Sequence, residues 1–254
     1  MLKTIGMKKY FGGLCAVNNL DLKLKSGEIL GLIGPNGAGK TTVFNLITGF
    51  LKPSEGDILF KGKNIVGKKS HVIAADGIVR TFQIVKSFQD MTVMQNLEAA
   101  SHLYSGIHLW DAIFQTPAYR KKAQKGRRHI IKILQFLGLE AWRDEKAGTL
   151  PHGHQKRLGI AIAMTANPDL LLLDEPLEGM NPGEVAEVLE IIEKIRMSGV
   201  SILLIEHNMR AVMKICDRIV VLNFGTQIAS GSPEQIQQNP KVVEAYLGVG
   251  AHGN

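Results

Sequence analysis

The stretch Ile29 to Thr42, ILGLIGPNGAGKTT, most constrains what this chain can fold into. Its apolar beginning predicts a short buried strand, and residues 34–41 then match the pattern G-x-x-x-x-G-K-[ST]. A helical pattern follows over residues 42–48, and Gly49 stands where a helix C-terminal cap is expected. The glycines let backbone N–H groups approach a phosphate, and the helix points its positive end at the same place. The stretch therefore predicts a nucleoside triphosphate site rather than an ordinary glycine-rich turn.

Two polar residues of this loop, Lys40 and Thr41, have individual expected roles. The Lys40 ammonium can reach the β- and γ-phosphates, and the Thr41 hydroxyl can ligate Mg²⁺. The residues expected to bind the phosphates are Gly34, Pro35, Asn36, Gly37, Ala38, Gly39, Lys40, Thr41 and Thr42.

Length and composition restrict the class of protein. The chain has 254 residues, which is enough for one large or two small domains, and 45% of them are apolar. No apolar run approaches the ~18 residues that a membrane span needs, and Lys8 and Lys9 interrupt any signal-peptide core. Two cysteines predict no disulfide framework and favour a reducing cytoplasm. The net charge of +7 is compatible with nucleic acid, an anionic membrane surface or a nucleotide as partner.

The order of patterns predicts an α/β fold with a helical insertion. Residues 2–25 read as β structure, since Leu20, Leu22 and Leu24 alternate with polar residues. Helical periods replace strands between about residues 85 and 150, and the α/β alternation returns from about 155. We therefore expect a nucleotide-binding core with a mostly parallel sheet and an N-terminal antiparallel β portion over residues 1–84 and 156–254, and a helical subdomain over 85–155.

Local signals predict how several elements begin and end. Ser70 is expected to cap a short helix that Gly77 ends, and a strand is expected over residues 78–82. Thr92 and Ser232 each precede a Gln by three residues, which predicts two capping boxes. A helix is expected from roughly His154 to Ala166.

The helical insertion contains a basic stretch, RKKAQKGRR at residues 120–128. A solvated helix face, a contact with lipid headgroups or a membrane partner, and a nucleic-acid contact all fit such a run. No aromatic residues interleave the charges, which argues against nucleic acid.

Polar residues follow three of the predicted strands. Asp174 and Glu175 end the apolar run of residues 170–173, His207 follows a strand at 201–205, and Gln83 follows the strand that begins at residue 78. Because parallel strands end at the same edge of a sheet, these side chains are expected beside the phosphate loop. Asp174 and Gln83 can then place Mg²⁺, Glu175 can act as general base toward water, and His207 can reach the γ-phosphate. The alternative is a set of polar residues tolerated at strand ends.

Six motifs in order carry a resemblance that spans the chain. They are GPNGAGKT at 34–41, RTFQ at 80–83, LPHGHQKR at 150–157, LLLLDEP at 170–176, GMNP at 179–182 and IEHNM at 205–209. The chain resembles the ATPase subunit of ABC transporters, which have a RecA-like P-loop core. FGGLCAVNN at 11–19, GIVRTFQ at 77–83, the helical insertion and NPKVVEAYLG at 239–248 make it most similar to the ATPases of branched-chain (hydrophobic) amino-acid importers.

The resemblance implies further roles. Phe11 looks like the aromatic residue that stacks on adenine, with Val17 on the same face, and Gln83 looks like the glutamine that couples the γ-phosphate site to the membrane partner. Asn181 stands at the D-loop position of the dimer seam. In such proteins two ATPase subunits enclose two ATP molecules head to tail, and the signature loop of one faces the phosphate loop of the other.

The signature loop of this chain departs from the family pattern LSGGQ. The residues at that place are Leu150, Pro151, His152, Gly153 and His154. Proline offers neither the serine hydroxyl nor an N–H to a γ-phosphate. Our hypothesis is that this subunit's contribution to its partner's site survives in altered form, with His152 or His154 as a replacement donor, more strongly when protonated.

The resemblance implies an ATP- and Mg²⁺-dependent ATPase that powers an importer for branched-chain or hydrophobic amino acids. It would sit peripherally on the cytoplasmic face of the inner membrane. Its partners would be permease subunits, a second ATPase subunit (a sister or a copy of itself) and, indirectly, a solute-binding protein. Two alternatives stay open. One is the ATPase of a urea, amide or lipid-linked ABC transporter, and the other a soluble ABC-type ATPase acting on nucleic acid.

Overall fold

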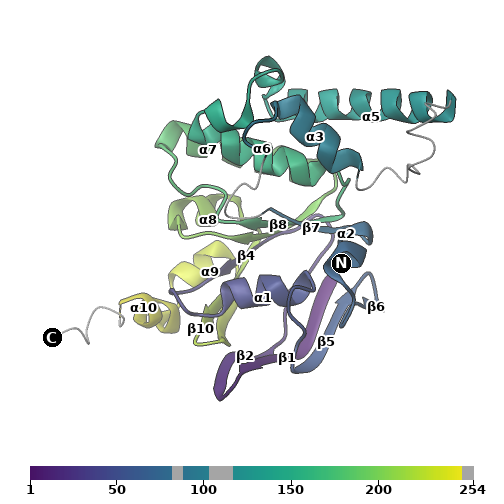
Figure 1. Cartoon of the computed structure of the whole chain (residues 1–254). Coiled ribbons are helices and arrows are strands. Elements are labelled where there is room, and N and C mark those ends of the chain that lie inside the picture. Colours follow the sequence, from purple (N-terminus) through teal and green to yellow (C-terminus); the bar gives the residue numbers. More distant parts are fainter. Residues whose placement is uncertain (82–87, 103–116, 248–254) are drawn as a thin grey trace. The chain divides into compact units, whose positions relative to one another are not determined.

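The computed structural model describes residues 1–81, 88–102 and 117–247, and the side chains of residues 102, 117–123 and 247 are not described (Figure 1). Gln83 lies outside the described residues. The chain divides into two compact units. The first comprises Met1–Arg80, Asp169–Leu177 and Ile192–Asn254, and the second comprises Thr81–Pro168 and Glu178–Ile191.

The main sheet of the first unit is parallel except at one edge. Its strands run in the order β11-β10-β4-β9-β8-β7, with only β11 antiparallel to its neighbour. Every residue of β4, β9 and β8 is buried, which is consistent with their largely apolar sequences. The strands are β4 (Ile29–Ile33), β7 (Ile78–Arg80), β8 (Leu170–Asp174), β9 (Ser201–Ile205), β10 (Arg218–Asn223) and β11 (Thr226–Gly231).

A second, antiparallel sheet is built from the N-terminal part of the chain. Its order is β2-β1-β5-β6, and β3 also pairs with β1. Leu20, Leu22 and Leu24 are buried while the intervening residues are exposed, so the predicted alternation is confirmed. The strands are β1 (Leu2–Phe11), β2 (Leu14–Leu20), β3 (Lys23–Leu24), β5 (Glu55–Phe60) and β6 (Lys63–Asn64).

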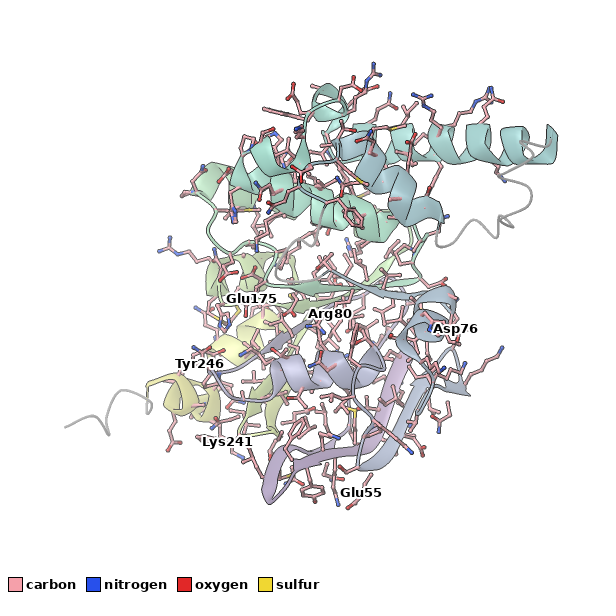
Figure 2. The ribbon with its side chains drawn as sticks, viewed as in Figure 1. Glu55, Asp76, Arg80, Glu175, Lys241 and Tyr246 are labelled. Carbon is pink, nitrogen blue, oxygen red and sulfur yellow. The ribbon has the colours of Figure 1, made fainter. Side chains whose placement is uncertain are left out.

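One hydrophobic core joins both sheets of the first unit to helix α1 (Lys40–Ile47). Phe44 of α1 is fully buried in that core, together with Met7 of β1, Leu20 of β2 and Leu172 of β8. Figure 2 shows side chains filling the space between α1 and strands β1, β2 and β5. The apolar face of the helix thereby fixes where the preceding phosphate loop lies.

The remaining helices of the first unit are short, and one of the two caps predicted for them is observed. Ser232 and Gln235 form the expected capping box, and the Asn208 side chain accepts from the backbone N–H of Ala211. The expected cap at Ser70 is wrong, because Ser70 is the first helical residue and Lys69, without a capping side chain, precedes it. The helices are α2 (Ser70–Ala75), α8 (Met209–Ile215), α9 (Pro233–Gln237) and α10 (Pro240–Leu247).

The described elements of the second unit are helical. They are α3 (Val93–His102), α5 (Pro117–Phe136), α6 (His152–Met164), the first part of α7 (Pro182–Met197), and the short 3₁₀ turns Glu140–Trp142 and Ala147–Thr149. Helix α3 packs on α5 and α6. The predicted capping box at Thr92 and Gln95 is confirmed, with N···O distances of 2.8 and 3.2 Å. Ile130, Ile133 and Leu134 are buried on one face of α5, and Leu137, the first residue after this helix, is buried too.

Some predicted boundaries shift by about two residues. Helix α6 begins at His152 rather than at His154, because Pro151 has an extended backbone and stands just before the first helical residue. Strand β7 ends at Arg80, short of the predicted end at residue 82. Helix α1 begins at Lys40, two residues before the predicted start.

Two surface properties bear on the sequence-based expectations. Lys125, Arg127 and Arg128 of the basic stretch are exposed on α5. No helix in the described ranges is both long and apolar enough to cross a membrane.

Candidate functional site

The phosphate loop lies between the end of β4 and the start of α1, as the sequence predicts. Gly39 has a φ of 97°, and a Cβ built there would lie 2.4 Å from the carbonyl oxygen of Ala16. Because strand β2 passes so close, only glycine fits at this position. The close approach also places β2 residues beside the loop.

Lys40 is the buried cation of this loop. Its Nζ donates to the carbonyl oxygens of Gly34 and Pro35 at 2.7 and 3.0 Å. Burial lowers the pKa of Lys40, and the charges of Glu175 and Asp174 oppose that shift. The loop therefore holds its own lysine in place through backbone carbonyls, with the ammonium directed into the region where a phosphate would be cradled.

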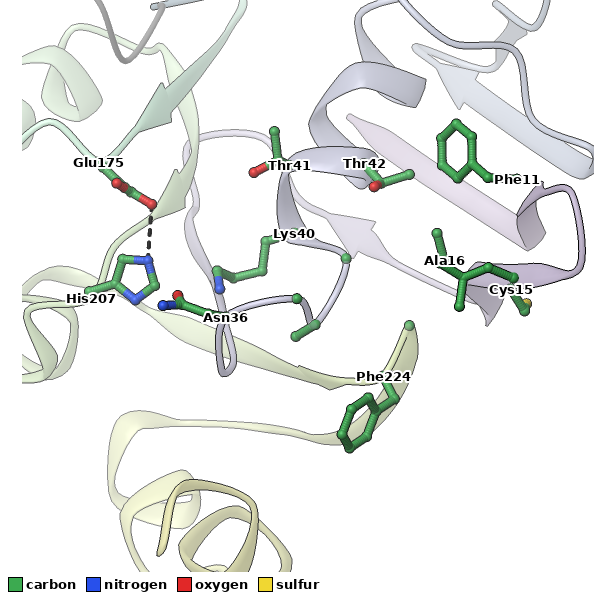
Figure 3. A pocket seen from close by; sticks show the side chains of 15 residues that line it. Phe11, Cys15, Ala16, Asn36, Lys40, Thr41, Thr42, Glu175, His207 and Phe224 are labelled. Atoms are coloured by element: carbon green, nitrogen blue, oxygen red, sulfur yellow. Dashed lines mark hydrogen bonds and ion pairs between the residues drawn. The ribbon is translucent and has the colours of Figure 1, made fainter. Parts of the chain in front are cut away.

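A pocket of about 440 Å³ opens at the loop (Figure 3). Glu175 and His207 lie at one end of it, and Phe11 and Phe224 lie on the far side of Lys40 from them. It is lined by Phe11, Leu14, Cys15, Ala16, Asn36, Gly37, Ala38, Gly39, Lys40, Thr41, Thr42, Glu175, His207, Phe224 and Gly225. An elongated pocket with two acid–base groups at one end and apolar rings at the other suits a nucleotide.

Glu175 and His207 contact each other directly. His207 Nε2 lies 2.9 Å from Glu175 Oε1, and the Glu175 backbone N–H donates to the Ile205 carbonyl oxygen at 2.9 Å. Glu175 has a φ of 49°, an uncommon backbone conformation for a residue with a side chain. Strained backbone of this kind clusters at functional sites, where the surrounding structure holds it. The two parallel strands β8 and β9 thus bring both predicted residues to one place.

Asp174, in contrast, is engaged within the protein. Its carboxylate accepts from Arg80 Nη2 at 2.6 Å across the pairing of β7 and β8, and it is buried. Asp174 is not among the pocket-lining residues, whereas Thr41 is. Both are oxygen donors, which suits a hard cation such as Mg²⁺ that takes most of its ligands from water and phosphate.

Glu206 organises the segments beside Glu175 and His207, and the sequence analysis missed it. Its buried carboxylate accepts backbone N–H groups of Leu177 at 2.7 Å, His207 at 2.9 Å and Asn208 at 3.2 Å. Burial raises the pKa of Glu206 against these hydrogen bonds. The sequence signal for this role was the position of Glu206 itself, an acidic residue directly after an apolar strand.

Phe11 and Val17, the two residues expected beside the adenine base, lie in different surroundings. Phe11 lines the pocket and its side chain is 46% exposed. Val17 is fully buried in the core, and Ala16, its neighbour on β2, lines the pocket instead. Successive residues of a strand face opposite sides, so Val17 is directed away from the side that Ala16 presents.

The signature stretch and Asn181 lie in the second unit, close to one another. His152 Nε2 is 3.0 Å from the Glu178 carbonyl oxygen. Asn181 caps α7 by accepting from the N–H groups of Gly183 and Glu184, and a Cβ on Gly153 would lie 2.7 Å from the Glu184 carboxylate. Leu150 is buried, while Pro151 is exposed. The stretch is thus packed against the start of α7.

His154 points into the second unit. Its ring lies 4.7 Å from that of Trp142, and its buried Nδ1 has no hydrogen-bond partner among the described residues. Burial lowers the pKa of His154, and the positive charge of Arg157 lowers it further, against an opposing effect of Glu184. The idea of a protonated His154 donor therefore has an electrostatic cost.

Comparison with known proteins identifies the family. Residues 17–178 match the family described as ABC transporter, which is more than half of the chain. The chain belongs to the ABC transporter family. Residues 226–252 match a second family description, branched-chain amino acid ATP-binding cassette transporter.

Relatives of the same length carry related names. The chain is 44% identical to the high-affinity branched-chain amino acid transport ATP-binding protein BraF of Pseudomonas aeruginosa, over 98% of both chains. It is 46% identical to LivG of Escherichia coli K12, a protein of the same description, again over 98% of both. A solved ATP-binding cassette of an ABC transporter, in an ADP conformation, superposes with a TM-score of 0.86 at 34% identity over 98% of both chains.

These findings confirm several expectations for this ABC transporter protein. The resemblance to ABC ATPase subunits, the closer resemblance to branched-chain amino-acid importer ATPases, the P-loop α/β fold and the ATPase activity are all confirmed. The roles of the individual site residues remain predictions, which the geometry of the pocket supports.

Proposed function

We propose that this chain is the ATP-hydrolysing subunit of a membrane importer for branched-chain or other hydrophobic amino acids. The observation that carries the proposal is the Glu175–His207 pair at 2.9 Å, which lies at one end of the pocket that the Lys40 loop lines. The amino-acid substrate comes from the names of relatives that are 44–46% identical over nearly the full length.

Hydrolysis would proceed by in-line attack of water on the γ-phosphate. The Lys40 ammonium and the backbone N–H groups of the loop stabilise the charge on the transferring phosphoryl group. Glu175 accepts the proton of the attacking water as general base. His207, whose Nε2 lies 2.9 Å from Glu175 Oε1, orients that carboxylate. As an imidazolium, with a proton on both ring nitrogens, it could also donate to the γ-phosphate.

Mg²⁺ is the cofactor that fits these donors. Among the described residues, the Thr41 hydroxyl and the Asp174 carboxylate would hold the ion, and Gln83, outside the described residues, is the third expected ligand. When bound, the ion neutralises charge on the β- and γ-phosphates. Among the described residues no cluster of three His, Cys, Asp or Glu side chains forms a metal site, so a cation would depend on water and phosphate oxygens.

The partners would be permease subunits and a second ATPase subunit in a head-to-tail dimer. The D-loop residue Asn181 and the signature residues Leu150 to His154 would meet the phosphate loop of that second subunit. This arrangement is inferred from the family resemblance. In this arrangement the chain would lie on the cytoplasmic face of the inner membrane.

Purification of the intact membrane complex tests this function. The chain should co-purify with two integral membrane proteins, and the complex in lipid should hydrolyse ATP faster when a solute-binding protein loaded with leucine is added. The same binding protein loaded with urea or an amide is the control for the alternative transporters. Co-purification with ribosomes or nucleic acid in place of membrane proteins would overturn the proposal.

A further inference from the structure

Phe224 is an aromatic residue that packing within the chain does not account for. It lies in the turn between β10 and β11, and 82% of its side chain is exposed, the highest value among the exposed large apolar residues of the described chain. It nevertheless lines the nucleotide pocket. A large apolar side chain so open to water gains little from folding.

The backbone at Phe224 is also unfavourable for a phenylalanine. Asn223 pairs with Thr226, so Phe224 and Gly225 form a two-residue hairpin turn with φ values of 44° and 75°. Such turns need positive φ at both positions and favour Asn-Gly or Gly-Gly. An aromatic residue in this conformation stores strain, and strain of this kind marks positions with a function.

The turn is fixed to the nucleotide site on two sides. The Gly225 N–H donates to the Ala38 carbonyl oxygen of the phosphate loop at 3.0 Å, and the Gly225 carbonyl oxygen accepts from Asn18 of β2 at 2.8 Å. Phe224 therefore stands on a rigid platform whose position follows that of the loop.

Phe11 occupies the same end of the pocket. Figure 3 shows Phe11 and Phe224 on the side of Lys40 away from Glu175 and His207. The Lys9 ammonium lies 5.2 Å from the centre of the Phe11 ring and covers one face of that ring. Only the other face of the Phe11 ring remains for a ligand. A base stacked on that face has a second face of its own, which Phe11 does not cover.

In Figure 3 the Phe224 ring points away from Phe11. We propose that Phe224 is a second aromatic residue of the base subsite, and that its ring turns toward the base of a bound nucleotide that is stacked on Phe11. The proposal rests on the proposed function, since it takes the phosphates to lie at Lys40. Stacking accepts any base because every base has a π-face, so Phe224 adds affinity for the base without choosing among bases.

Binding to the full-length chain tests this assignment, with ATP and with inorganic triphosphate, which lacks a base. Phe224→Ala should weaken ATP binding by about 5- to 100-fold and leave the Kd of triphosphate unchanged. Phe224→Tyr keeps a ring and should bind ATP as the native chain does. Phe50→Ala removes another exposed aromatic residue, 55% exposed and outside the pocket lining, and should change neither Kd.

A stability measurement separates this role from a structural one. Phe224→Gly relieves the positive φ, so its Tm should equal or exceed that of the native chain while ATP binding weakens as in Phe224→Ala. ATP binding by Phe224→Ala within twofold of native, or an equal loss for ATP and triphosphate, would overturn the proposal. Failure of the native chain to bind either ligand would instead overturn the proposed function itself.

Discussion

Arg80 and Asp174 form a buried ion pair, with Nη2 of Arg80 2.6 Å from Oδ2 of Asp174 and the two side chains 9% and 3% exposed. Arg80 Nη1 also donates to the Asn45 side chain at 2.6 Å, and its guanidinium lies 5.5 Å from the centre of the Phe44 ring. The carboxylate expected to serve Mg²⁺ is therefore positioned by a cation anchored on helix α1. The pair links the strand that carries Asp174 to the helix that follows the phosphate loop.

Removing Arg80 should strongly destabilise the first unit. Arg80→Ala leaves the Asp174 carboxylate buried without its guanidinium, and breaking a buried pair in this way costs roughly 3–5 kcal/mol. Urea denaturation followed by circular dichroism measures the loss. Lys8→Ala, which removes the exposed Lys8–Glu55 pair at 2.7 Å, is the matched control and should shift the midpoint little. Equal midpoints for the two variants would contradict the role of the buried pair.

Glu175→Gln should separate ATP binding from ATP hydrolysis. The amide keeps the shape of the side chain but cannot accept the proton of water, so turnover should fall by about 10²-fold or more. Binding should persist because Lys40 and the loop backbone are untouched. Steady-state phosphate release and equilibrium ATP binding by the assembled transporter measure the two effects. Rapid hydrolysis by this variant would rule out Glu175 as the general base.

The sequence predicts the parts of the site that depend on strand ends. Asp174 and Glu175 end one apolar run and His207 follows another, and parallel strands place these residues at one edge of a sheet by geometry alone. Short sequence patterns likewise predict the loop that carries Lys40 and the capping boxes at Thr92 and Ser232. These features are local, so a short stretch of sequence contains their cause.

Other parts of the site depend on contacts between distant segments. Arg80 and Asp174 are 94 residues apart, and no periodicity relates them. Whether Ala16 or Val17 lines the pocket depends on the pairing of β2 with β1, which has register shifts near these residues. The exposed Phe224 violates the residue preference of its turn, and such a violation becomes informative only when the turn is seen beside the pocket.

His152 should act as a positioning residue for the D-loop. Its Nε2 donates to the Glu178 carbonyl oxygen, and it faces Gly179, whose φ is 76° and where an added Cβ would lie 3.0 Å from Nε2. His152→Leu removes the donor and should lower the kcat of the assembled transporter about 3- to 10-fold, the loss expected for one neutral hydrogen bond. His152→Gln supplies an amide N–H and should recover most of the rate, with KM for ATP unchanged in both. Equal rates for the Leu and Gln variants would exclude this hydrogen bond as the cause.

The two cysteines should differ in reactivity, and only one should report on the nucleotide. Burial raises the pKa of Cys216 to about 12, so its thiol should resist iodoacetamide in the folded chain. Cys15 is half-buried and lines the pocket. Mass spectrometry should find alkylation at Cys15 alone, slowed by added ATP. Modification of Cys216 at the same rate would contradict its burial. A lack of protection of Cys15 by ATP would contradict its position in the nucleotide pocket.

His154 should make the stability of the second unit fall under mild acid. Burial and the charge of Arg157 hold the pKa of His154 below its ordinary value, with Glu184 as the opposing neighbour. The unfolded chain then binds more protons than the folded one below about pH 6.5, so stability decreases as pH falls through that range. His154→Gln removes the titration and should flatten the dependence of Tm on pH between about 5 and 6.5 relative to the native chain. Burial also lowers the pKa of His129, which therefore adds its own dependence of Tm on pH, and this variant retains it.

The alternative is that a protonated His154 donates to a partner's phosphate. In that case His154→Gln and Pro151→Ser should each change the pH profile of the transporter's ATPase rate, while the dependence of Tm on pH stays that of the native chain.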